Sequence, residues 1–192
     1  EFETNLNIKK GTLKNQKIIQ EYFPLINDQI NIENHKINLK YKNKDFTLKG
    51  EGKVKLNKDF DYFKYFYNKN DKDFEFISDI NLKSVDLKNQ EFLKQFFPST
   101  KKFLNLQNHK INIKYKNGSL TFSGNGNIKI DKNYDEINYF VLNDKEKTNF
   151  DLKLISNQTD FEIKNFNYKK NTNEKTNLSV AGILKSSKSL NF

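Results

Sequence analysis

The residues that could do chemistry are few, and they recur at a fixed spacing. His35 and His109 are the two histidines of the chain, and both stand in the sequence Asn-His-Lys, 74 residues apart. One histidine in a polar turn, with no carboxylate cluster beside it in the sequence, is typical of a solvated turn residue rather than of a metal ligand or a general base. We therefore expect both imidazoles to face solvent.

The acidic side chains are the next candidates for chemistry. Asp59, Asp61, Asp71, Asp73 and Glu75 are interspersed with lysines and with asparagine-rich turns. Paired carboxylates in acid–base catalysis need environments that separate their pKa values, and nothing in this pattern indicates such an environment. The acids are therefore interpreted as turn formers and as part of a solvated face.

A Gly-x-Gly pair occurs at Gly50 and Gly52 and again at Gly124 and Gly126. A dinucleotide-binding fingerprint requires a strand-to-helix turn and a third glycine, and both are missing here. Each pair lies on one face in the middle of a strand pattern. We expect the missing side chains to permit a bend or bulge and a close approach of neighbouring groups.

Composition excludes several classes of protein. The chain has no cysteine, so it has no disulfide, no thiolate metal site and no cysteine nucleophile. No nucleophile elbow, Walker loop or EF-hand pattern is present. The sequence therefore predicts a protein that is not an enzyme and that carries no metal and no cofactor.

The formal net charge of +10 comes entirely from lysine, since all 34 basic residues are lysines. Reading of phosphates and guanine edges relies mainly on the arginine guanidinium group, so we expect no specific nucleic-acid partner. The abundance of Lys, Asn, Ile, Phe and Tyr is also typical of an AT-rich genome, which explains part of the charge without a binding function.

An internal repeat organises the chain. The segment that begins Asn34-His35-Lys36-Ile37 returns as Asn108-His109-Lys110-Ile111, and Phe23-Pro24 returns as Phe97-Pro98 at the same offset of 74 residues. Such self-similarity indicates a repeat architecture. We divide the chain into repeat 1 (residues 1–75), repeat 2 (76–149) and a partial repeat 3 (150–192). The chain opens without methionine, so we expect a segment of a larger protein.

Within each unit the dominant period is two, which predicts half-buried strands. Asn117-Gly118 separates two of these strands and predicts a tight hairpin. Only residues 17–23 and 91–97 break the alternation, and each predicts two turns of helix that end before a proline. The predicted fold class is mostly β: tandem antiparallel sheet repeats, each with about five strands and a short helix, which form an elongated curved sheet or groove.

The continuous apolar face of such a sheet can be kept from water in two ways. A second layer can cover it as an ordinary core, or the face can stay accessible and bind an apolar ligand. The sequence supplies few covering elements, which favours the second solution. The predicted lining of a lipid groove consists of the apolar residues at one parity of the strands: Phe46, Leu48, Val54, Leu56, Phe74, Phe76, Leu120, Phe122, Ile128, Ile130, Phe150, Leu152 and Leu154.

The repeat resembles that of the AsmA-like family, which includes the large TamB and YhdP envelope proteins. The resemblance rests on the glycine-containing strands Phe46–Leu56 and 118–131, on the segment 134–139, on the alternating strand Phe150–Leu154 and on the closing Leu178–Leu184. It implies a repeating β-groove that carries phospholipid acyl chains towards the outer membrane. It also implies a periplasmic location and an inner-membrane anchor outside this segment.

Two other classes of function remain open from the sequence. One is a structural or adhesive surface repeat, in which the strands form a sealed core and the lysine face binds an acidic partner. The other is a non-specific nucleic-acid binder that uses lysines and stacked aromatic rings. A folded monomer that purifies free of lipid and binds no apolar dye would favour the first class. Nucleic-acid binding that falls steeply as the salt concentration rises would favour the second.

Overall fold

The fold is known from a computed structural model of the chain, which describes residues 1–89, 97, 100–130, 132–144, 146–163 and 167–185. The strands are β1 (Phe2–Lys14), β2 (Gln29–Lys42), β3 (Asp45–Lys55), β4 (Asp61–Lys69), β5 (Phe74–Lys88), β6 (Phe103–Lys116), β7 (Ser119–Lys129), β8 (Tyr134–Asn143), β9 (Lys147–Ser156), β10 (Phe161–Ile163), β11 (Tyr168–Lys170) and β12 (Thr176–Lys185). The helix is α1 (Lys17–Tyr22).

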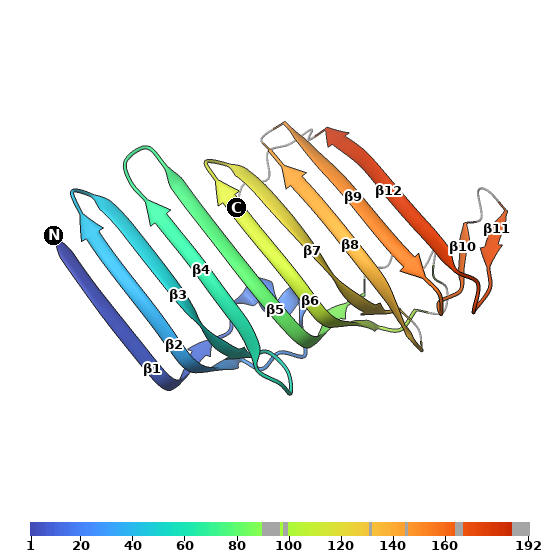
Figure 1. Cartoon of the computed structure of the whole chain (residues 1–192), viewed down its shortest axis with the longest axis horizontal. Coiled ribbons are helices and arrows are strands. Elements are labelled where there is room, and N and C mark those ends of the chain that lie inside the picture. Colours follow the sequence, from blue (N-terminus) through green and yellow to red (C-terminus); the bar gives the residue numbers. More distant parts are fainter. Residues whose placement is uncertain (90–96, 98–99, 131, 145, 164–166, 186–192) are drawn as a thin grey trace.

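One large antiparallel sheet dominates the molecule (Figure 1). Its ten strands follow the order β1-β2-β3-β4-β5-β6-β7-β8-β9-β12, so nearly every strand pairs with its neighbour in sequence. The sheet is open, with β1 at one edge and β12 at the other, and it does not close into a barrel. The predicted all-β fold class, an elongated curved sheet of antiparallel repeats, is confirmed.

The repeat in the sequence is also a repeat in the pairing of the strands. Tyr65 of β4 lies opposite Ser78 of β5, and the equivalent Tyr139 of β8 lies opposite Leu152 of β9. Each 74-residue unit contributes four strands to the sheet, because the strand that begins at Phe74 is already the first strand of the next unit. The sheet runs through the unit boundaries without interruption.

The hairpin turns follow the sequence prediction. Asn117 and Gly118 connect β6 to β7 with φ angles of 49° and 90°, as a two-residue turn with both residues in the left-handed region requires. The first unit makes the same turn with Asn43 and Lys44, at φ angles of 49° and 71°. Lysine at such a φ is strained, whereas glycine is not.

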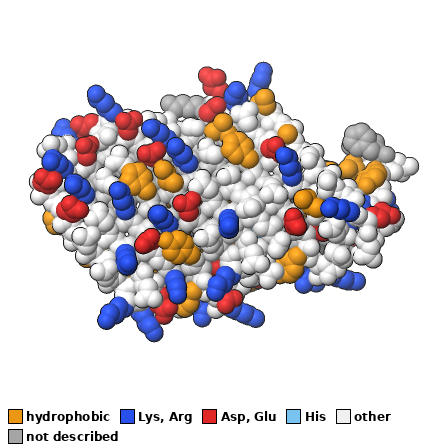
Figure 2. Space-filling view, in the orientation of Figure 1, with side chains coloured by type: hydrophobic (Ala, Val, Ile, Leu, Met, Phe, Trp, Pro, Cys, Tyr) orange, Lys and Arg blue, Asp and Glu red, His pale blue; other side chains and the backbone are white. Residues whose placement is uncertain are grey.

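The sheet has two chemically different faces, which we call the apolar face and the polar face. Residues directly opposite each other in neighbouring strands point to the same face, so the printed pairs extend each face across the sheet. The pair of Leu39 and Leu48 belongs to the apolar face, and the pair of Asn38 and Lys49 belongs to the polar face. Figure 2 shows the polar face, where lysine and acidic side chains are intermixed and hydrophobic side chains form only small separate groups.

The hydrophobic core covers only one half of the apolar face. This covered half consists of the buried residues Ile30, Ile32, Val54, Leu82, Val85, Leu104, Leu106, Ile128, Ile130 and Leu154. Ile26, Phe97 and Phe161 complete the cluster from outside the large sheet. Helix α1 lies behind this end of the sheet and contacts β5 (Figure 1). Burial of each such side chain contributes about 1.5–3 kcal/mol, so this half anchors the fold.

The helix predicted over residues 17–23 is confirmed as α1, which ends two residues before Pro24. The second predicted helix, residues 91–97, lies outside the described residues except for Phe97. The Phe97 side chain is buried, and its ring centroid lies 5.8 Å from that of Phe161. The third unit differs from the others, because the short hairpin of β10 and β11 precedes β12. Within the described residues, no helix has the length and apolar character needed to span a membrane.

Candidate functional site

The residues predicted to line a groove share the apolar face, but they divide into two groups. Val54, Ile128, Ile130 and Leu154 belong to the buried core, and Leu56 packs against it. The remaining eight are only partly buried and lie toward the other ends of their strands: Phe46, Leu48, Phe74, Phe76, Leu120, Phe122, Phe150 and Leu152. The structure therefore brings the predicted residues onto one face but assigns five of them to ordinary packing.

The second group belongs to a surface that we call the open half of the apolar face. Besides those eight residues it contains Leu39, Tyr41, Tyr67, Ile113, Tyr115 and Val141, which lie opposite them in the strand pairs. None of these side chains is part of the core cluster or is packed against it. The main contacts between described elements are those of neighbouring strands, with α1 against β5 and β10 against β11, so no described helix or second sheet covers the open half.

A row of aromatic rings crosses the open half near the hairpin ends of the strands. The ring of Phe46 lies 5.6 Å from that of Tyr67, Tyr67 lies 5.3 Å from Phe74, and Phe74 lies 5.2 Å from Tyr115, between ring centroids. All three pairs meet edge to face, a favourable geometry for aromatic contacts. The prediction from sequence omitted Tyr67 and Tyr115. Both tyrosines could have been predicted from the sequence, because they alternate in their strands at the same parity as the predicted lining residues.

The expectation that the histidines are solvated is wrong. His35 is 4% exposed and His109 is 1% exposed. Each follows a residue with positive φ, Asn34 or Asn108, at a point where the pairing register shifts as in a β-bulge. The extra residue rotates the strand so that the imidazole turns onto the apolar face instead of into water. Local sequence did not reveal this, because a bulge inverts the parity of the residues that follow it.

Each buried imidazole belongs to a small cluster at the border between the covered and open halves. His35 stacks on Tyr65 with 5.7 Å between ring centroids, and its Nε2 lies 3.3 Å from the Tyr65 hydroxyl oxygen. His109 stacks on Tyr139 at 6.0 Å. Burial lowers the pKa of both histidines, since the charged imidazolium loses its hydration. Burial also raises the pKa of Tyr139 to about 12.

The glycine pairs provide the space for these rings. A Cβ atom at Gly126 would lie 2.4 Å from Nδ1 of His109, and one at Gly124 would lie 2.4 Å from the hydroxyl oxygen of Tyr139. Gly52 and Gly50 do the same for His35 and Tyr65 in the first unit. The predicted close approach is therefore confirmed. The bulge itself lies in the neighbouring strand, opposite the glycines.

Asp61 is the acid for which the predicted solvated role is wrong. It is 2% exposed, and its Oδ1 accepts a hydrogen bond of 2.6 Å from the backbone N–H of Lys83, at the irregular point of β5. Burial raises the pKa of this carboxyl group, although the Lys83 bond opposes the shift. The equivalent Asp135 is also buried and accepts the backbone N–H groups of Asn157 and Gln158. Both carboxylates have a structural role: they satisfy backbone donors where a strand bends or ends.

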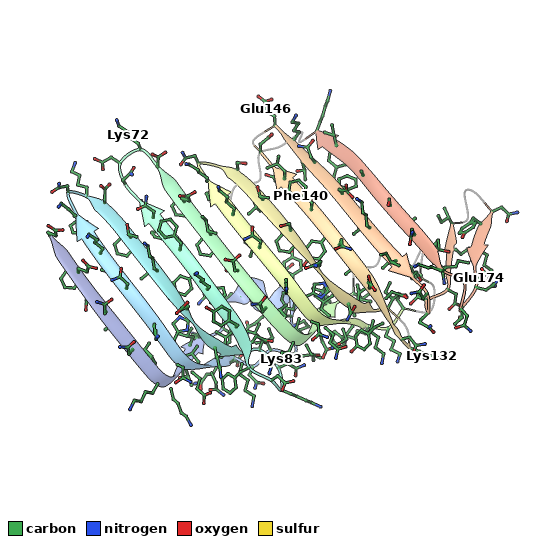
Figure 3. All side chains as sticks on the ribbon, viewed as in Figure 1. Lys72, Lys83, Lys132, Phe140, Glu146 and Glu174 are labelled. Atoms are coloured by element: carbon green, nitrogen blue, oxygen red, sulfur yellow. The ribbon has the colours of Figure 1, made fainter. Side chains whose placement is uncertain are left out.

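The polar face carries two hollows of about 570 and 690 Å³. They occupy equivalent positions in the two units: Lys36 lines the first where Lys110 lines the second, and Lys64 corresponds to Asn138. Phe140, which Figure 3 labels on this face, borders the second hollow. None of the predicted groove residues lines either hollow, so the predicted site is an extended apolar surface rather than the wall of these hollows.

No group of three or more acidic or histidine side chains in the described part of the chain could hold a metal ion. The carboxylates of Asp61 and Asp135 accept backbone N–H groups, whereas Nδ1 of His35 and both ring nitrogens of His109 have no hydrogen-bond partner among the described residues. The open half itself offers apolar contact area rather than acid–base groups. In comparisons with known proteins, no family model, no curated protein and no solved structure matches this chain.

Proposed function

We propose that this chain is a lipid-handling segment in which the open half of the apolar face binds phospholipid acyl chains. The observation that carries the proposal is the division of one continuous apolar face into a covered and an open half. The side chains of the open half continue the same parity as the core, but no described element packs over them. An apolar surface of this extent in a water-exposed protein is typical of an interaction site.

The dimensions and energetics of the open half fit acyl chains. Strands are spaced about 4.8 Å apart, so the surface from β2 to β9 is roughly 34 Å wide, similar to the ~30 Å hydrocarbon core of a bilayer. Each methylene group removed from water contributes about 0.8 kcal/mol. Because both units contribute apolar side chains at the same strand parity, a bound acyl chain can move from one unit to the next along the surface.

The resemblance to AsmA-like proteins extends this proposal to a cellular location and a transport route. In that setting the repeat is one segment of a β-groove that carries phospholipid between the inner and outer membranes, in the periplasm of a Gram-negative bacterium. The anchor in the inner membrane lies in other parts of such a protein. The open sheet and its regular register support this extension, since further units can lengthen the surface without changing its chemistry.

The alternative is a structural or adhesive surface repeat, and the two equivalent hollows on the polar face favour it. Their walls mix lysines with asparagine and acidic side chains, as a polar partner would require. In this alternative the polar face binds and the apolar face is sealed. The two functions therefore predict contacts on opposite faces of the same strands.

A pair of neighbouring positions in β7 distinguishes them. Phe122 lies opposite Val141 on the apolar face, and Thr121 lies opposite Leu142 on the polar face. A photo-crosslinking amino acid at Phe122 should capture phospholipid in living cells, whereas the same amino acid at Thr121 should not. Capture at neither position, or equal capture at both, would refute the lipid proposal. Capture of a polar partner at Thr121 alone would favour the adhesive repeat.

A further inference from the structure

One lysine lies on the apolar face, at the end of β4. Lys69 is directly opposite Phe46 of β3 and Phe74 of β5, and directly opposed residues of neighbouring strands point to the same face of a sheet. It follows Tyr65 and Tyr67 at the alternation that defines this face, and its side chain is exposed. At the hairpin that joins β4 to β5, the open half of the apolar face therefore ends in a cation.

The ammonium group of Lys69 has no partner among the residues that the structure describes: no ion pair, hydrogen bond or cation–π contact engages it there. The two acids of the adjoining hairpin are engaged elsewhere. Asp71 pairs with Lys44 at 3.3 Å, and Oδ1 of Asp73 accepts a hydrogen bond of 2.8 Å from the side-chain amide of Asn117. The charge of Lys69 is therefore available to an anionic group of a ligand.

The residues next to Lys69 form a transition from polar to apolar surface. Tyr67 precedes Lys69 by two residues, which is about 7 Å along the strand. Leu48 and Phe76 lie directly opposite Tyr67 on the two neighbouring strands. Tyrosine and lysine at the border between hydrocarbon and water are typical of protein surfaces that face lipid headgroups. The order of cation, tyrosine and hydrocarbon matches that of phosphate, ester and acyl chain in a lipid.

We propose that Lys69 is the headgroup site of the open half, where it binds the phosphate of a lipid whose acyl chain lies on the adjoining apolar residues. This rests on the proposed function, since the acyl chain occupies the same surface. The ammonium group donates charge-assisted hydrogen bonds to the phosphate oxygens. From Lys69 to Tyr65 the open half extends only about 13 Å along β4, so a longer acyl chain continues across the neighbouring strands.

The second unit lacks this site. At the offset of 74 residues, the position of Lys69 is taken by Asn143, which lies opposite Leu120 and Thr148. The Asn143 side chain is neutral, and its Nδ2 donates a hydrogen bond of 2.6 Å to Oγ1 of Thr148. The apolar surface thus continues through both units, whereas the cation belongs to the first. A lipid that moves into the second unit loses its phosphate contact.

Two lipids with the same dibrominated acyl chain separate the headgroup from the hydrocarbon: lysophosphatidic acid carries a phosphate, and monoacylglycerol does not. Binding to the full chain is followed by quenching of the single tryptophan of Phe76→Trp, which lies on the apolar face one strand from Lys69. Lys69→Gln then removes the cation. Lys72→Gln is the matched control, because it removes the same charge from the hairpin that follows β4, where Figure 3 labels Lys72.

We expect lysophosphatidic acid to bind about fivefold more tightly than monoacylglycerol, which is the contribution of one lysine near a lipid anion. Lys69→Gln should abolish this preference without changing the affinity for monoacylglycerol, and Lys72→Gln should retain it. An equal concentration of inorganic phosphate should not displace the lipid.

The headgroup proposal is overturned if the preference survives Lys69→Gln, if Lys72→Gln abolishes it equally, or if inorganic phosphate displaces the lipid. Equal affinity of the starting protein for the two lipids overturns this proposal alone. Absence of quenching by either lipid, in a protein that circular dichroism shows to be folded, overturns the binding of acyl chains as well.

Discussion

The fit between Gly126 and His109 gives the most quantitative prediction about the fold. In Gly126→Ala the new Cβ would lie 2.4 Å from Nδ1, 2.6 Å from Cγ and 2.8 Å from Cα of His109. The ring cannot easily move aside, since it is 1% exposed and stacked on Tyr139, and Cα belongs to the backbone of β6. Strand and side chain must both shift.

The expected cost follows from two opposing effects. Overpacking of a well-packed site costs about 1–3 kcal/mol, and a backbone contact places this site toward the upper end. Replacing glycine in a strand interior by alanine returns about 0.5–1 kcal/mol of chain entropy. We therefore expect Gly126→Ala to lower the free energy of unfolding by roughly 1–2 kcal/mol.

Gly11→Ala is the matched control, because it makes the same change in a strand without the same obstruction. Its Cβ would meet Ile8 Cγ2 at 3.3 Å and Ile32 Cγ1 at 3.4 Å, both side-chain atoms that can adjust. We expect a change within about 0.5 kcal/mol or a small gain in stability. Urea unfolding followed by circular dichroism measures both variants. Equal stability of the two variants would refute the view that the glycine pair exists to seat the histidine and tyrosine rings.

Three further predictions address other parts of the structure. Leu104→Ala in the covered half should lower the free energy of unfolding by about 2–5 kcal/mol, and Leu120→Ala in the open half should lower it clearly less. Urea unfolding measures both variants, and equal losses would mean that the open half is packed as well. Burial places the folded-state pKa of His35 and His109 below the unfolded value near 6.5, so stability should fall as the pH drops from that value toward the folded pKa. The double variant with glutamine at both positions should lose this component, and an unchanged pH profile would exclude buried neutral imidazoles. Lys44→Gly should raise the free energy of unfolding by about 1 kcal/mol, because the φ of 71° suits glycine, and a loss of stability would show that the exposed ion pair of Lys44 with Asp71 matters more.

The sequence predicted those features that depend on local pattern. The alternation of Phe46, Leu48 and Val54 with polar residues identified a strand and its inner face, and Asn117-Gly118 identified a hairpin turn. The 74-residue offset predicted a repeat architecture, and in the structure β4–β5 and β8–β9 pair in the same register. Each of these depends on neighbours within a few residues or on the repeat itself.

The features that the sequence did not predict depend on pairing between strands. The burial of His35 and His109 follows from a bulge, which is defined by the register with the next strand and is not visible in Asn-His-Lys. The buried role of Asp61 depends on an N–H group 22 residues away in β5. The division of the groove residues into core and open surface depends on which part of the sheet α1 and the adjoining segments cover, and strand parity contains no such information.

The central claim, that the open half of the apolar face binds acyl chains, can be tested most directly by fluorescence quenching. The chain has no tryptophan, so Phe122→Trp and Thr121→Trp each introduce a single reporter, on the apolar and polar faces respectively. Each purified variant is mixed with phospholipid brominated on its acyl chains, which quenches only by contact. The account predicts strong, saturable quenching of the tryptophan at position 122 and little at position 121. Equal quenching at both positions, or none at position 122 in a folded protein, would contradict it.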